Sequence, residues 1–327
     1  MSLGCQQHLE RFEFVRPEMG TVFSIVLYAP SAATAKQASD AAFARAHELN
    51  DLLSDYDPKS EISRLSRQTD AGPMTQPVSV GPDLWQLIER SIEASRKSNG
   101  AFDITLGPCI RLWRRSHQMG ELPTPERLAE ARKSVGWEAI RLFPETHGVQ
   151  LLKPKMRLDV GGIAKGYTAM EMVALMRKQG FPRAMAGAAG DIAVGDPPPG
   201  KSHWRVAIQS LAHPDQTAGY ADLRNASIST SGDTERYIII DGRRYSHIID
   251  PRTGLGLTHR VGANVIATDG SAADWMCKPL CVLGPEEGMK LIESTPGAAA
   301  RMVTLEGEQT KTFESHRWHE FEAAALH

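Results

Sequence analysis

Apolar residues recur at helical spacing in several segments of this chain. Residues 34–54 and 81–100 place apolar side chains three and four positions apart among good helix formers, which predicts two amphipathic helices. Gly100 is expected to close the second helix. Thr124, directly before a proline, predicts the N-cap of a third helix. Residues 55–67 are polar and contain an Asp-Pro turn, so we interpret them as a connection.

Strand patterns and further helices follow without a regular βαβ alternation. Residues 22–28 predict a strand, and residues 183–266 predict short strands separated by Gly, Pro and Asp turns. Helices are expected over residues 165–180 and from Ser271, the latter kinked at Pro279. This mixture favours an α+β fold over a doubly wound parallel sheet.

Composition narrows the class of protein. The 327 residues are 41% hydrophobic and 23% charged, which is typical of a globular protein with a large core, in one domain or two intimately associated lobes. A net charge of −2 without a basic stripe argues against a nucleic-acid partner. No stretch approaches the roughly 20 apolar residues of a membrane-spanning helix. Four cysteines in a chain of this length predict neither a disulfide framework nor a zinc site.

The tripeptide Leu-Gly-Cys that ends at Cys5 resembles the end of a bacterial lipoprotein signal, although no apolar segment precedes it. A processed lipoprotein and a chance match are both open interpretations. On the first, the protein lies on the periplasmic side of the cell envelope, anchored by a lipid on Cys5. We divide the chain into a disordered N-terminal remnant (residues 1–11), one domain (residues 12–315) and a C-terminal tail (residues 316–327).

The segment RLDVGGIAKGYTAM joins an acid, two glycines and a lysine to the start of a predicted helix. Gly161 and Gly162 let the backbone approach a ligand closely, and the helix behind them offers N–H groups and the positive end of its dipole. Lys165 adds a point charge for phosphate, and Asp159 can accept from a ligand or hold a cation. The arrangement suits a pyrophosphate, and the alternative is an ordinary strand-to-helix turn.

Two other segments carry candidate binding groups. Phe102 can stack on a flat ring while Asp103 accepts its N–H donors, or the pair can form a turn around a buried aromatic. Residues 227–233 predict a hydroxyl-rich loop after a strand. Its hydroxyl and N–H groups can bind phosphate or make local turns.

The later segments carry a candidate proton carrier and an acidic helix. His247 precedes the turn Asp-Pro-Arg-Thr-Gly and can move a proton near neutral pH, whereas Asp250 and Arg252 can fix the turn. Asp274 and Lys278 are four positions apart, so they share one face of the last predicted helix.

Taken together and in this order, the segments resemble the ApbE family, the FAD:protein FMN transferases. The likeness runs from Met19 to about Val303 and is carried by MGT, AFDITLGP, LDVGGIAKGY, AAGDIAVG, STSGD, HIIDPRTG and AADWMCKPLCVLG. It implies an ApbE-type α+β fold with FAD in a cleft between two lobes. It also implies transfer of FMN to a threonine of an acceptor protein, with release of AMP. Acceptors in the family are membrane-associated redox subunits, including those of sodium-pumping and Rnf-type complexes.

The resemblance assigns residues to the two halves of the reaction. The catalytic group would contain His247 as general base, with Asp250 and Arg252 beside it. The FAD-binding residues would be Met19, Tyr56, Ala101, Phe102, Asp103, Asp159, Lys165, Ser229, Thr230, Ser231 and Gly232.

The family uses Mg²⁺, and here the chain departs from the pattern. The resemblance assigns the ion to the Gly162 carbonyl and Asp274, with further ligands three and four residues after the acid. Those positions hold Cys277 and Lys278. A thiol is a poor ligand for hard Mg²⁺, and a protonated lysine is none. Two alternatives to the transferase therefore stay open, a protein that only binds FAD and a pyrophosphatase that gives FMN and AMP.

Overall fold

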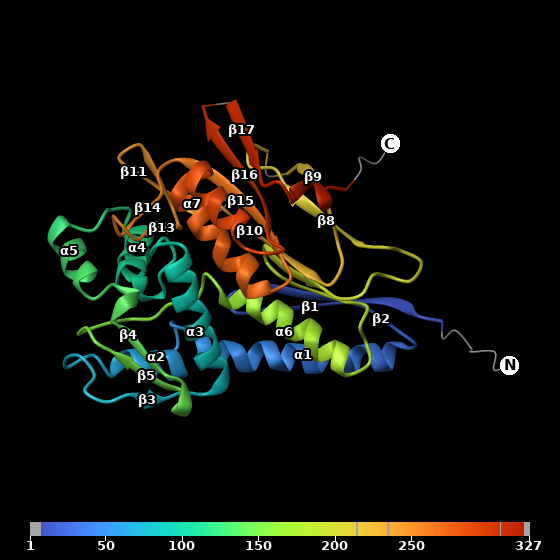
Figure 1. The fold of residues 1–327 in the computed structure, drawn as a ribbon, viewed down its shortest axis with the longest axis horizontal. Helices are drawn as coiled ribbons and strands as arrows, with labels where there is room; N and C mark the ends of the chain where they lie inside the picture. The colour runs from blue at the N-terminus through green and yellow to red at the C-terminus, as the bar shows by residue number, and fades with distance from the viewer. Residues whose placement is uncertain (1–7, 214, 234–235, 308, 324–327) are drawn as a thin grey trace.

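An eight-stranded antiparallel sheet forms the centre of the larger lobe (Figure 1). The computed structural model describes residues 8–323, apart from 214, 234–235 and 308. The strands of the sheet, in spatial order, are β1 (Glu10–Glu18), β2 (Thr21–Ala29), β6 (Ala184–Ala188), β7 (Asp191–Val194), β10 (Ala226–Gly232), β15 (Arg260–Ala267), β16 (Ala299–Glu306) and β17 (Gln309–Glu314). Every neighbouring pair is antiparallel, so the expected α+β class is confirmed.

Three helices pack side by side on one face of this sheet, namely α1 (Ala32–Leu53), α6 (Ala164–Lys178) and α7 (Gly270–Glu293). Strand β2 alternates, and its buried Phe23, Ile25 and Leu27 meet Phe43 of α1 and Met172 of α6. Because every second residue of a strand points to the same face, this alternation fixes which side of the sheet the helices cover.

The opposite face is covered by the hairpin of β8 (Trp204–Gln209) and β9 (Thr217–Leu223). Trp204, Val206 and Ile208 alternate inward and pack with Trp318 from the short helix η4 (Trp318–Glu320). Trp318 is only 1% exposed. The predicted tail from residue 316 therefore contributes to the core of the domain.

The smaller lobe is mainly helical. Its helices are α2 (Glu61–Arg67), α3 (Pro82–Lys97), η1 (Ile104–Leu106), α4 (Gly107–Met119), α5 (Pro125–Lys133), η2 (Trp137–Ala139) and η3 (Pro144–Thr146). A small sheet combines β3 (Val78–Ser79), β5 (Gly148–Leu151) and β4 (Ile140–Phe143). Two separate hairpins follow later in the chain, β11 (Tyr237–Ile240) with β12 (Arg243–Ser246), and β13 (Ile249–Asp250) with β14 (Leu255–Gly256). Strand β14 contacts β12 and helix α4.

Of the helix ends predicted from capping residues, one is confirmed and others differ in the structure. The Thr124 hydroxyl accepts from the N–H of Arg127 and caps α5, as expected. Helix α3 ends at Lys97 rather than at Gly100, because Asn99 already adopts a positive φ of 50°. The expected connection over residues 55–67 is wrong in its second half. There the Ser60 hydroxyl caps α2.

Two other predictions need correction. Helix α7 keeps helical geometry at Pro279 and breaks at Gly284, whose φ of 79° and ψ of −175° precede a second proline. Strand β1 starts at Glu10, inside the segment predicted to be disordered, because residues 10–18 pair along the whole of β2. Cys5, the predicted lipid attachment point, lies outside the described residues.

Within the part of the chain that the structure describes, no helix has both the length and the apolar character needed to cross a membrane.

Candidate active site

A cleft of about 1050 Å³ lies between the two lobes. This exceeds the usual range for small-molecule sites, roughly 300–1,000 Å³, and leaves room for a dinucleotide. Fourteen of the residues singled out from the sequence line it: Met19, Tyr56, Ala101, Phe102, Asp103, Asp159, Gly161, Gly162, Lys165, Thr230, Ser231, Gly232, His247 and Lys278. Five others do not: Ser229, Asp250, Arg252, Asp274 and Cys277.

The Gly-Gly segment forms a tight turn at the wall of the cleft. The Asp159 carboxylate accepts from the N–H of Gly161 at 2.8 Å, which fixes the turn before α6 begins. A Cβ on Gly162 would lie 3.1 Å from the Phe102 ring and 3.4 Å from Cε of Lys278. Glycine is therefore required for close packing at this position.

The start of α6 is not open to an external anion in the way the sequence suggested. The N–H of Gly166 donates to Oδ2 of Asp274 at 3.0 Å. Asp274 is fully buried, and its carboxylate takes the place at the positive end of the helix dipole that we had expected a phosphate to fill.

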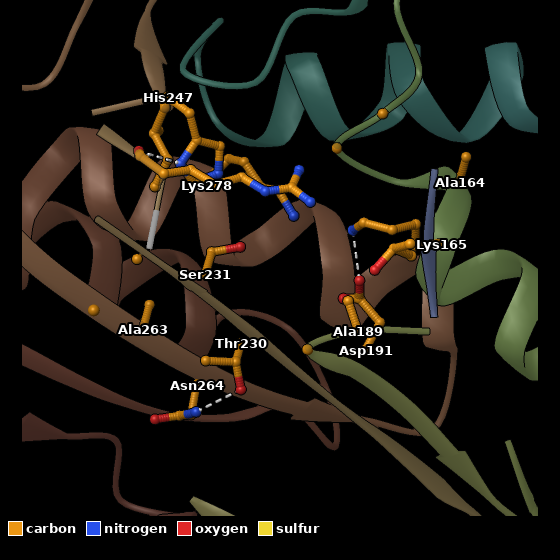
Figure 2. A pocket seen from close by; sticks show the side chains of 18 of the residues that line it. Ala164, Lys165, Ala189, Asp191, Thr230, Ser231, His247, Ala263, Asn264 and Lys278 are labelled. Carbon is orange, nitrogen blue, oxygen red and sulfur yellow. Dashed lines mark hydrogen bonds and ion pairs between the residues drawn. The ribbon is translucent and has the colours of Figure 1, made fainter. Parts of the chain in front are cut away.

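Two lysines and two aspartates form a buried cluster at the base of the cleft. We call Lys165, Asp191, Asp274 and Lys278 the lysine–aspartate cluster. Lys165 Nζ lies 2.6 Å from Asp191 Oδ2 (Figure 2). Lys278 Nζ donates to the backbone carbonyl of Asp274 at 2.9 Å and pairs with its carboxylate. The four formal charges sum to zero, which makes burial of the cluster tolerable.

Burial and charge act in opposite directions on the two aspartates of the cluster. Burial raises the pKa of Asp191, whose Oδ1 has no hydrogen-bond partner among the described residues. Burial also opposes ionisation of Asp274, but Lys165 and Lys278 together hold its pKa below the ordinary value. Asp274 is therefore ionised and already paired.

His247 lies next to this cluster with one ring nitrogen fixed. Its Nδ1 is 3.1 Å from the carbonyl oxygen of Arg236, which can only accept, so Nδ1 carries the proton. In the described part of the chain Nε2 has no partner, which leaves its lone pair for a ligand. Burial, reinforced by the positive charges of Lys278, Arg236 and Lys165, lowers the pKa of His247 to about 4. The ring is neutral at pH 7.

An aromatic ring and an arginine also line the cleft. The Arg114 guanidinium lies 3.9 Å from the centre of the Tyr56 ring and donates to Asp159 at 3.0 Å and to Asp55 at 2.6 Å. Burial and the nearby Asp55 charge raise the pKa of Asp159 to about 6, although Arg114 opposes the shift. Both carboxylate oxygens of Asp159 thus accept hydrogen bonds from the protein, one from the N–H of Gly161 and the other from Arg114.

Several residues that line the cleft were not predicted from the sequence. Trp113 and Arg114 come from α4, whose amphipathic pattern GPCIRLWRRSHQM could have revealed the helix. Asn264 of β15 donates to the Thr230 hydroxyl at 2.9 Å, a pairing that only the register of β10 and β15 creates. Arg236 also lines the cleft.

The hydroxyl-rich segment is a strand and not a loop. Residues 226–232 form β10, so Thr230 and Ser231 point to opposite sides while both border the cleft. Ser229 lies deeper. Its carbonyl accepts from the Cys277 thiol at 3.3 Å, and its hydroxyl is buried without a partner among the described residues.

Three of the charged residues predicted for the site make hydrogen bonds or ion pairs within the protein. Asp103 caps η1 by accepting from the N–H and hydroxyl of Thr105 at 2.8 and 2.7 Å. Arg252 Nη2 and Nε bind Asp250 at 2.8 and 2.9 Å, and Arg252 also donates to the carbonyl of Val282. Asp250 and Arg252 thus fix the turn after His247, and neither of them lines the cleft.

The residues expected to hold Mg²⁺ do not fit that ion. The chain offers Asp274, but one of its oxygens binds Lys278 and the other the N–H of Gly166. The thiol of Cys277 is buried and points to Ser229. In the described residues no group of three or more His, Cys, Asp or Glu side chains is arranged to hold a metal. We therefore assign no step to a metal ion.

Known sequences resemble this chain over most of its length. The pattern of the ApbE family matches residues 19–302. A relative from Klebsiella pneumoniae, named FAD:protein FMN transferase, is 32% identical over 278 residues, which are 83% of this chain and 77% of the relative. A relative of the same name from Escherichia coli is 30% identical over 276 residues, again 83% of this chain and 77% of the relative.

Solved structures agree with the sequence relatives. The flavin transferase ApbE of Vibrio cholerae superimposes with a TM-score of 0.84 at 26% identity, covering 96% of this chain and 100% of the other. The flavinyl transferase ApbE of Pseudomonas stutzeri, in its apo form, gives a TM-score of 0.82 at 27% identity, covering 97% and 98%.

Proposed function

The chain belongs to the ApbE family, and on that premise we propose that it is an FAD:protein FMN transferase. It moves FMN from FAD to a threonine hydroxyl of an acceptor protein and releases AMP. The observation that carries the proposal is the position of His247, with Nε2 available, in the same cleft as Lys165 and Lys278.

The residues of the cleft match the parts of this reaction. The threonine oxygen attacks the phosphorus of the FMN half, a new P–O bond forms, and the bond to the AMP phosphate oxygen breaks. The threonine proton passes to Nε2 of His247, which is neutral at pH 7 and so able to accept it. Lys165, Lys278 and Arg236 line the cleft and offer N–H donors to the phosphates. Tyr56, Phe102 and Trp113 offer flat surfaces for the ring systems.

The direct test uses FAD and a purified acceptor domain. We expect FAD to bind with low-micromolar or tighter affinity by quenching of flavin fluorescence. We expect the acceptor to gain a yellow, denaturation-resistant flavin while AMP appears in equal amount. An acceptor whose target threonine is replaced by alanine is the control. Free FMN with AMP and no label would indicate a pyrophosphatase. Failure to bind at about 100 µM FAD, weaker than about −5.5 kcal/mol, would refute the function.

Asp159 supports binding more than chemistry. Asp159→Ala removes the acceptor that fixes the Gly161 turn and leaves Arg114 without one of its two carboxylates. We expect the Kd for FAD to rise at least about tenfold, the loss of about 1.4 kcal/mol. His247→Ala is the matched comparison, since that residue acts on the threonine proton and its Kd should stay near wild type. The reverse order of the two Kd values would make His247 a binding residue.

The location and the acceptor are further parts of the proposal. The Leu-Gly-Cys sequence at Cys5 supports a place on the periplasmic side of the envelope, which cell fractionation tests. The transferase function itself requires an acceptor protein, and a membrane-associated redox subunit is the class we propose.

A further inference from the structure

We propose that Lys278 takes the place of a divalent cation, so that this protein binds the pyrophosphate of FAD without a metal. The inference rests on the proposed function, because it concerns how the same cleft holds FAD. Two observations support it, the position of Lys278 and the hydrogen bonds that its ammonium group makes.

Lys278 fills the space between the two groups that would have to share a metal ion. Its Cε lies 3.4 Å from the position of a Cβ on Gly162, and its Nζ pairs with the Asp274 carboxylate. The side chain is 19% exposed, whereas that of Asp274 is fully buried. A cation between Gly162 and Asp274 would therefore have to displace a packed ammonium group from a buried carboxylate.

Lys278 also borders the cleft in which FAD would bind. Lys278 lines the cleft beside His247 (Figure 2). The fully buried Asp274 does not line it. A lysine has three N–H donors, and two of them go to the carbonyl and carboxylate of Asp274. In the described part of the chain the third has no partner, and a phosphate oxygen in the cleft is the acceptor that suits it.

The arrangement changes the charge available to the substrate. Mg²⁺ on Asp274 would leave one positive charge, while Lys278 on Asp274 leaves none. Lys165 is likewise neutralised by Asp191. Two other cations of the cleft have carboxylate partners of their own, since Arg114 pairs with Asp55 and Asp159 and Arg301 pairs with Glu314. Arg236 also lines the cleft and belongs to none of these pairs. The cluster thus binds phosphate through fixed hydrogen-bond donors more than through net charge.

The experiment measures the Kd of FAD by fluorescence quenching, in excess EDTA and in millimolar MgCl₂. For the unmodified protein we expect the two values to agree within about twofold. Lys278→Met is expected to raise the Kd in EDTA at least about tenfold, the loss of one charge-assisted hydrogen bond. Lys290→Met, an exposed lysine on the same helix that pairs with Glu287, is the matched control and should leave the Kd unchanged.

A second variant guards against misfolding. Lys278→Met leaves the buried Asp274 charge without one partner, so the double variant Asp274→Asn, Lys278→Met removes both charges together. It should bind FAD as weakly as the single variant. Titration of Mn²⁺ followed by EPR should detect no tight site in the unmodified protein.

Each result is decisive. FAD binding that collapses in EDTA and returns with MgCl₂, or a double variant with wild-type affinity in EDTA, would overturn the inference while leaving the transferase function intact. Absence of FAD binding in both buffers would overturn the proposed function and this inference with it.

Discussion

Replacing His247 with glutamine is expected to lower the rate constant for FMN transfer by about 100- to 10,000-fold, the range for loss of a general base. The Kd for FAD should change little, because glutamine keeps a polar side chain at the wall of the cleft. The rate constant is measured as formation of labelled acceptor in single-turnover reactions at saturating FAD. His203→Gln replaces an exposed histidine before β8 and is the matched control, expected to transfer at the wild-type rate.

The pH dependence gives this prediction a second readout. Since burial and the neighbouring cations lower the pKa of His247 to about 4, the ring accepts protons at all higher pH values. The rate should therefore be constant from about pH 5 to pH 8 and fall as the pH drops through 4. An ordinary histidine would lose activity near pH 6.5. A rate that fell at that higher pH, or a His247→Gln enzyme with normal turnover, would remove His247 from the role of base.

Local sequence signals located helices and strands in both lobes. Thr124 and the alternation of β2 act within a few residues, so their structural effect could be read directly from the sequence. The break in α7 was predicted at the wrong position because the helix contains two prolines, Pro279 and Pro285. The structure shows that the backbone stays helical at Pro279 and leaves helical geometry at Gly284, directly before Pro285.

The chemistry of the site was less accessible, because its residues meet across long sequence distances. Lys165 was expected to present a free charge to phosphate, yet it pairs with Asp191, 26 residues later. Asp274 was expected to bind a metal, yet it accepts from Gly166, 108 residues earlier. Residue type and spacing correctly indicated which residues line the cleft. The packing of α6 and α7 on the sheet determines which ion pair or hydrogen bond each charged residue makes, and the sequence did not show this.

That packing makes Gly166 a sensitive position outside the cleft. A Cβ there would lie 2.1 Å from the carbonyl oxygen of Gly270 and 2.7 Å from Cβ of Asp274. The converse also holds, because a Cβ on Gly270 would lie 2.4 Å from the carbonyl oxygen of Gly166. Helices α6 and α7 thus meet backbone to backbone at their first turns, and no side-chain rotation can relieve the contact.

Gly166→Ala is therefore expected to lower the free energy of unfolding by about 3 kcal/mol, at the upper end of the cost of overpacking. In an open helix the same change would stabilise by about 1 kcal/mol, so the sign of the effect tests the contact. Because the N–H of Gly166 binds Asp274, separating the helices also disturbs Lys278, and FAD should bind more weakly. Urea denaturation followed by circular dichroism gives the stability. Lys178→Ala, exposed at the end of the same helix, should change it by less than about 0.5 kcal/mol. A Gly166→Ala protein as stable as the wild type would mean that α6 and α7 do not approach this closely.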